Sequence, residues 1–187
     1  MQPRIPRQST SEQGIRHADG EAGLSAELVA VVTGARRRAL RDGDRHIDTA
    51  HLLHSLLESD PEARAVFGEG PQMARLLGYL VQRSIGYGLR WQGGVEASGP
   101  LPTPPAPSSV TESAAEGFSP LAAGAMVHAC ERAALRGGEP ARCVDLLAAI
   151  VLDPQARAVE VLARAGVDPR EVAARIDSGL EEYAGGA

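Results

Sequence analysis

The residues best suited to chemistry lie in one stretch of the chain. His51 and His54 are three positions apart, which places both side chains on one face of a helix, and His46 and Glu58 are close in sequence. Histidines at helical spacing can bind a metal ion. No cysteine or further histidine falls into register with this pair, so we predict neither a metal site nor a cofactor here.

Other catalytic arrangements are missing from the sequence. Asp44, Asp48, Glu58 and Asp60 cluster around predicted helix starts, where acidic side chains commonly act as caps. There is no G-x-S-x-G sequence and no glycine-rich phosphate loop before a helix. All 19 basic residues are arginine, which excludes a Walker A lysine, a Schiff-base lysine and a lysine general base. We therefore predict that the protein is not an enzyme.

The two cysteines, Cys130 and Cys143, form neither a CxxC pair nor a disulfide framework, so reduced thiols are expected. Cys130 falls on a predicted apolar helix face and is interpreted as a small core residue. Cys143 lies at or near a predicted helix N-terminus, where the helix dipole lowers a thiol pKa. Redox sensing, or a small hydrolase or redox enzyme that uses Cys143, therefore stays open as an alternative.

Composition favours a helical, soluble protein. Of the 187 residues, 43% are hydrophobic but only 3% are aromatic, so the core must consist mainly of Leu, Val, Ile and Ala, which favours packed helices over a sheet. The formal net charge of −5 argues against general affinity for nucleic acid or anionic membranes. No apolar run is long enough to span a bilayer, and the first residues lack the apolar segment of a secretory signal. We expect a cytoplasmic location.

Helical periodicity begins after a polar stretch, residues 1–23, that is expected to be disordered. The apolar positions Leu28, Val31, Val32, Ala35 and Ala39 share one helix face, which Gly43 ends. Asp48 or Thr49 caps a second helix, Asp60-Pro61 begins a short third one, and a fourth runs from about Met73 to Ser84. Trp91, which follows the fourth helix, is expected either to close the core of the first repeat, which we favour, or to lie on a partner-binding surface.

The second half of the chain repeats this pattern. Residues 39–57 (ALRDGDRHIDTAHLLHSLL) resemble residues 134–151 (ALRGGEPARCVDLLAAIV) at a separation of about 95 residues. That separation places Ala123, Met126, Val127, Cys130 and Ala134 on the face that matches the first helix. Ser119-Pro120, Asp153-Pro154 and Asp168-Pro169 are predicted to begin helices.

These patterns predict an all-α fold of two pseudo-symmetric four-helix repeats joined by a Pro-rich linker. The predicted organisation is a tail at 1–23, a first repeat at 24–91, a linker at 92–117 and a second repeat at 118–184.

The order of parts resembles the Clp N-terminal domain, the double-repeat helical module of the ClpA and ClpC unfoldases. The resemblance covers residues 24–183 and is carried by Leu24-Ser25, Thr49-Ala50-His51-Leu52-Leu53, Phe118-Ser119-Pro120, Leu146-Leu147 and residues 156–176 (ARAVEVLARAGVDPREVAARI). It implies a structural role for His51 and a binding site, by family position, at Ser25, Thr49, Ala50, Ser119 and Val144. Family glutamates that help to hold phosphoarginine are replaced by Ala50 and Val144, so that specificity is not carried over.

The resemblance implies a non-catalytic module that binds a protein or peptide. It would act as an adaptor, decoy or regulator in Clp-dependent proteolysis, with the ClpC and ClpP machinery, its substrates or cyclic-peptide ligands as partners, and without nucleic acid or membrane. The alternative is a helical DNA-binding regulator that uses the arginines of Arg36–Arg41.

Overall fold

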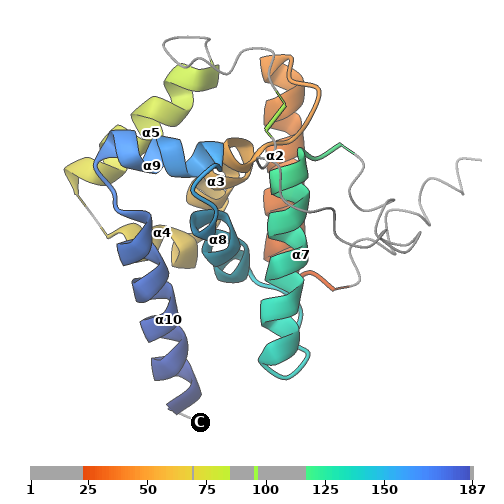
Figure 1. The fold of residues 1–187 in the computed structure, drawn as a ribbon, viewed down its shortest axis with the longest axis vertical. Coiled ribbons are helices and arrows are strands. Elements are labelled where there is room, and N and C mark those ends of the chain that lie inside the picture. The colour runs from red at the N-terminus through yellow and green to blue at the C-terminus, as the bar shows by residue number, and fades with distance from the viewer. Residues whose placement is uncertain (1–22, 69, 85–94, 97–116, 186–187) are drawn as a thin grey trace, which may run out of the picture.

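The computed structural model describes residues 23–68, 70–84, 95–96 and 117–185. Within these residues the chain forms eight helices (Figure 1). They are α2 (Ala26–Asp42), α3 (Thr49–Ser59), α4 (Pro61–Phe67), α5 (Pro71–Ser84), α7 (Pro120–Leu135), α8 (Cys143–Leu152), α9 (Arg157–Ala165) and α10 (Pro169–Gly185). The predicted all-α class is confirmed. Residues 1–22, Trp91 and most of the predicted linker lie outside the described residues.

Most predicted helix boundaries follow from local capping chemistry. The hydroxyl groups of Ser25 and Ser119 accept hydrogen bonds from backbone N–H groups in the first turns of α2 and α7. Asp48 and Asp60 cap α3 and α4 in the same way. Gly43 ends α2 in the left-handed conformation, with φ of 76°, which suits a residue without a side chain. Each half therefore starts with a serine-capped helix.

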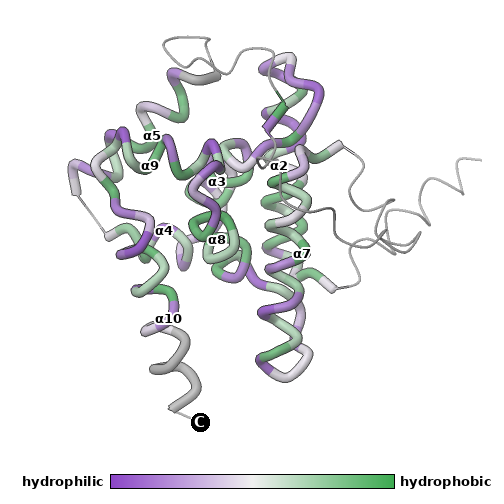
Figure 2. The backbone as a smooth tube through the Cα atoms, in the orientation of Figure 1, coloured by the Kyte–Doolittle hydropathy of each residue, from purple (hydrophilic) through white to green (hydrophobic). Residues whose placement is uncertain are grey.

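The centre of the molecule consists of α3 and α8. Every residue from Thr49 to Leu57 and from Cys143 to Val151 is buried. Helix α3 packs against α2, α4, α5, α7, α8 and α9, and α8 packs against α2, α3, α4, α7, α9 and α10 (Figure 1). Figure 2 shows the hydrophobic character concentrated along α8. No helix of the described part is both long and apolar enough to cross a membrane.

Equivalent positions in the two halves are separated by 94 residues, as the capping residues Ser25 and Ser119 show. Two isolated backbone bridges join the halves crosswise, Leu24 with Ala141 and Ile47 with Phe118. Because 94 residues also separate Leu24 from Phe118 and Ile47 from Ala141, the two bridges are one contact made twice with the partners exchanged. The two halves therefore contact each other through equivalent positions.

The predicted buried face of α7 was wrong by one residue. The buried positions are Leu121, Ala122, Ala125, Ala129 and Ala133, rather than the set that contains Cys130. Cys130 is exposed, and Ala129 is the counterpart of Ala35. The sequence comparison aligned the ends of the two helices, but α7 ends one residue earlier than α2, whereas their capped starts correspond.

The prediction that Asp153-Pro154 begins a helix was also wrong. Asp153 instead begins a short turn, in which its carboxylate accepts a hydrogen bond from the backbone N–H of Gln155. Helix α9 starts at Arg157, and its N-cap, Ala156, has no side chain that can accept a hydrogen bond. The prediction for Asp168-Pro169 is confirmed, since α10 begins at Pro169.

Candidate functional site

Glu96 lies at the meeting point of three helix starts. Its carboxylate accepts hydrogen bonds from the backbone N–H of Thr49 (2.9 Å), the backbone N–H of Arg157 (2.7 Å), the hydroxyl of Ser119 (2.7 Å) and the hydroxyl of Thr49. Only 4% of Glu96 is exposed. A residue from the predicted linker thus binds the N-termini of α3 and α9 and the capping residue of α7, where the helix dipoles favour an anion.

The local sequence explains why a distant carboxylate is needed there. Helix α9 has no side-chain cap of its own, because its N-cap is Ala156. Thr49 partly replaces the cap by accepting a hydrogen bond from the backbone N–H of Ala158 (3.1 Å), and Arg157 pairs with Asp48 (2.8 Å). These contacts join the first half of the chain to the second.

The helix of the first half that corresponds to α9 is α4, and α4 has a capping carboxylate of its own. Asp60 caps α4 and also accepts a hydrogen bond from the thiol of Cys143, the counterpart of Thr49. The residue 94 positions after Asp60 is Pro154, which has no carboxylate. Glu96, from the predicted linker, therefore supplies what Asp60 supplies locally.

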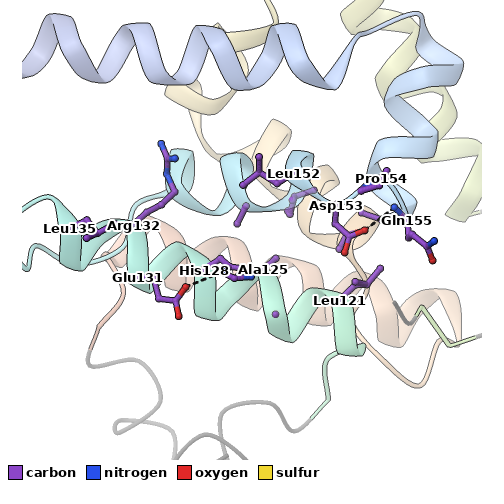
Figure 3. A pocket seen from close by; sticks show the side chains of 15 residues that line it. Leu121, Ala125, His128, Glu131, Arg132, Leu135, Leu152, Asp153, Pro154 and Gln155 are labelled. Atoms are coloured by element: carbon purple, nitrogen blue, oxygen red, sulfur yellow. Dashed lines mark hydrogen bonds and ion pairs between the residues drawn. The ribbon is translucent and has the colours of Figure 1, made fainter. Parts of the chain in front are cut away.

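A groove of about 760 Å³ begins beside this site and runs between α7 and α8. Figure 3 shows Leu121, Ala125 and His128 on α7 facing Leu152 at the end of α8. Thr49 and Ala156 also line the groove, and Glu96 bonds to Thr49 and to the backbone N–H of Arg157, the residue after Ala156. Figure 3 shows Arg132 and Leu135 at the end away from Pro154 and Gln155. Its exposed leucines, Leu135 and Leu152, are 88% and 66% exposed.

In the first half, two polar contacts join the corresponding helices, α2 and α3. There, the hydroxyl of Ser55 donates a hydrogen bond to a backbone carbonyl of α2 (2.7 Å), and Arg38 forms an ion pair with Glu58 across α2 and α3. The counterparts of Ser55 and Glu58 are Ala149 and Leu152. Neither alanine nor leucine can make these contacts, so the two links between α2 and α3 have no equivalent at the same positions of α7 and α8.

No protein-family profile and no curated protein matches the sequence. Among solved structures, the chain is similar to the crystal structure of the N-terminal domain of the caseinolytic protease associated chaperone ClpD from Arabidopsis thaliana. The TM-score is 0.58 at 16% identity, over 86% of this chain and 99% of that chain. The chain has the fold of a Clp N-terminal domain.

Within the Clp N-domain fold, the site residues predicted from sequence separate into two groups. Thr49 and Ser119 come together on Glu96, whereas Ser25 caps α2 and its backbone N–H donates to the carbonyl of Ala141 (2.9 Å). Ala50 is fully buried and Val144 is 3% exposed. Sequence reasoning missed Glu96; the available signal was the absence of a polar capping residue before α9.

The expectation of a lowered thiol pKa at Cys143 was wrong. Burial raises the pKa of the Cys143 thiol, and its hydrogen bond to the Asp60 carboxylate raises it further. Partial desolvation also raises the pKa of the Cys130 thiol, although the residue is largely exposed. The alternative in which Cys143 acts as a thiolate nucleophile therefore lacks its physical basis, because the thiolate is the reactive form.

The arginine-rich face of α2 is partly engaged within the protein. Arg38 pairs with Glu58 and donates a hydrogen bond to Nδ1 of His54 (3.2 Å), while Arg36 and Arg37 are exposed. The arginines of this segment therefore do not form one uninterrupted free surface.

Proposed function

We propose that the protein is a non-catalytic module of Clp N-domain fold that binds a protein or peptide segment in the cytoplasm. It acts as an adaptor, decoy or regulator in Clp-dependent proteolysis. The observation that supports this function best is the open, largely apolar groove between α7 and α8 in the second half of the chain.

The groove suits an extended or helical segment with apolar side chains. Leu135 and Leu152 offer exposed apolar side chains, while the buried Leu121, Ala125 and Ile150 line the groove. Burial of apolar surface supplies the main favourable free energy of such association. Exposed, contiguous apolar surface on a soluble protein commonly marks an interaction site. Arg132 and Asp153 give the two ends opposite charges, which would orient a bound segment.

Glu96 fits this role as an internal anchor beside the groove. Because it holds the starts of α3, α7 and α9 together, it fixes the wall at which Thr49 and Ala156 line the groove. A ligand would therefore meet a preorganised end, which reduces the entropic cost of binding.

The function is tested by measuring the affinity of the full chain for purified ClpC, for ClpP and for a panel of Clp substrates. The discriminating variant is Leu152→Glu, which introduces the residue type of its counterpart Glu58 and lets Arg132 close the groove as Arg38 does in the first half. We expect binding to weaken at least about tenfold, equivalent to about 1.4 kcal/mol.

The matched control is Leu40→Glu, which changes an equally exposed leucine (74%) on α2, outside the groove. It should leave binding unchanged. Absence of binding to every Clp component and substrate would contradict the proposal, as would equal effects of the two variants. Retention of duplex DNA that weakens with salt would instead support the DNA-binding alternative.

A further inference from the structure

The outer face of α2 is positively charged, although the whole chain has a formal net charge of −5. Arg36, Arg37, Leu40 and Arg41 are exposed; Leu40 lies three residues after Arg37, and Arg41 lies four after it. Residues at these spacings are neighbours on a helix surface, with Cβ atoms about 5–6 Å apart. The four side chains therefore form one surface, which we call the basic face. Figure 2 shows the C-terminal part of α2 as mostly hydrophilic.

The charges of the basic face are weakly compensated within the protein. Arg36 and Arg37 form no ion pair with another residue in the described part of the chain. The Arg41 side chain, which is 64% exposed, lies 3.7 Å from a carboxylate oxygen of Asp42. Because Arg37 and Arg41 are like charges four residues apart, their repulsion destabilises the helix. A bound anion would remove this cost.

The fold itself does not require these arginines. A helix C-terminus favours a cation in its last turn, and on α2 that cation is Arg41, whereas the other two arginines lie earlier in the helix. The α7 positions equivalent to the basic face, 94 residues later, hold Cys130, Glu131, Ala134 and Leu135. Helix α7 therefore takes the same place in the second half of the fold with no arginine at these positions.

We propose that the basic face binds an acidic segment of a partner protein. Carboxylates of the segment would pair with Arg36 and Arg37, and an apolar side chain would cover Leu40, which is 74% exposed among the arginines. Duplex DNA fits this surface less well, because its phosphates offer no apolar contact to Leu40. Its dense negative charge is also repelled by a chain with a net charge of −5.

The contact made by the basic face is short. Arg41 follows Arg36 by five residues, which corresponds to about 8 Å along the helix axis. An extended partner covers that distance with about three residues. The association should therefore be weak and sensitive to salt. None of the four residues lines the groove between α7 and α8, so the basic face is a second surface and does not depend on the function proposed above.

The experiment measures, by fluorescence anisotropy, the binding of the full chain to a labelled peptide of glutamates around a central leucine. At physiological ionic strength we expect saturable binding that weakens as salt is added. The double variant Arg36→Gln with Arg37→Gln should weaken binding about tenfold, the loss expected from two exposed charge pairs. Arg37→Gln alone should raise the Tm of the unbound protein, because it removes the repulsion with Arg41. A purely structural arginine would lower the Tm when replaced.

Two substitutions that add the same charge separate a local contact from general electrostatics. Leu40→Glu should weaken binding of the acidic peptide at least about tenfold, because it places like charges together. Val81→Glu, at an exposed apolar site on α5 (51%), should leave it unchanged. The proposal is overturned if the peptide does not bind at physiological ionic strength, if the two variants lose affinity equally, or if duplex DNA binds more tightly than the peptide. Leu40→Glu should retain binding in the α7–α8 groove, so each proposal can fail without the other.

Discussion

The backbone N–H and the hydroxyl group of Thr49 both donate hydrogen bonds to the carboxylate of Glu96. Because Ser119 and Arg157 donate to the same carboxylate, one residue connects α3, α7 and α9 across the two halves of the chain. A buried carboxylate with four donors is stable only while those donors remain in place.

Glu96→Gln should lower the free energy of unfolding by about 1–3 kcal/mol. Glutamine carries no charge, and its NH₂ group replaces one acceptor oxygen although the surrounding groups are all donors. The loss is measured by urea unfolding. Hydrogen exchange should show faster exchange of either the Thr49 or the Arg157 amide, because the two amides bond to different carboxylate oxygens and glutamine keeps only one of them.

Glu139→Gln is the matched control, because Glu139 is exposed in the loop after α7. Its unfolding curve should match that of the parent protein. Equal stability of the two variants would mean that the Glu96 carboxylate does not hold the three helices together.

Much of the fold could be predicted because its determinants are local. Ser25, Asp48, Asp60 and Ser119 cap helices where the sequence placed helix starts, and each does so with a side chain adjacent to the helix it serves. The register of α7 failed because that helix is rich in alanine on several faces, so periodicity alone does not identify the buried one.

The candidate site was harder to predict because it depends on contacts between distant residues. Glu96 reaches Arg157 from 61 positions away. The contrast between Glu58, which pairs with Arg38, and the exposed Leu152 can be recognised only when the two halves are aligned at a separation of 94 residues. His51 was evaluated with His54, but in the structure it faces Asp42 and Asp44 instead.

Gly34 allows α2 and α3 to approach closely. A Cβ atom at Gly34 would lie 2.3 Å from Oγ of Ser55, whose hydroxyl is bonded to the carbonyl of Val31. Overpacking costs about 1–3 kcal/mol, and alanine returns about 1 kcal/mol of helix propensity. We expect Gly34→Ala to lower the unfolding free energy by about 1 kcal/mol in urea denaturation.

Two variants test the cause of that loss. Gly78→Ala, in α5, has open space around the new Cβ and should raise stability by up to about 1 kcal/mol. Adding Ser55→Ala to Gly34→Ala removes the clashing oxygen and should recover most of the loss. Persistent destabilisation in the double variant would show that the Ser55 hydroxyl is not the obstacle.

The two cysteines should differ in reactivity. Cys143 is buried and its pKa is raised by burial and by Asp60, whereas Cys130 is exposed on α7. A disulfide reagent should therefore modify one thiol in the native protein and both after denaturation. Cys130→Ser should remove the fast phase and Cys143→Ser should preserve it. Modification of Cys143 at the rate of Cys130 would contradict the buried thiol.

His54 should make the protein less stable in mild acid. Burial lowers the pKa of His54 to about 4, and the positive charge of Arg38 acts in the same direction. The structure explains the effect, since Arg38 donates to Nδ1 of the neutral ring and Nε2 faces Glu58 at 3.6 Å. A proton on Nδ1 would replace that hydrogen bond with repulsion between two cations.

The direction of the pH dependence follows from the lowered pKa. The unfolded chain takes up a proton near pH 6.5, whereas the folded protein resists protonation until about pH 4. The contribution of His54 is therefore complete above pH 6.5 and is lost as the pH falls from 6.5 toward 4. The protein should be about 2 kcal/mol less stable at pH 5 than at pH 7 by urea unfolding.

Glu58 stays ionised in this window because its pKa is lowered by Arg38, which outweighs the opposing effect of burial. His54→Gln cannot take up a proton and should remove most of this difference, whereas His128→Gln, at an exposed site, should retain it. A His54→Gln protein with the full pH dependence of the parent would assign the effect to other groups.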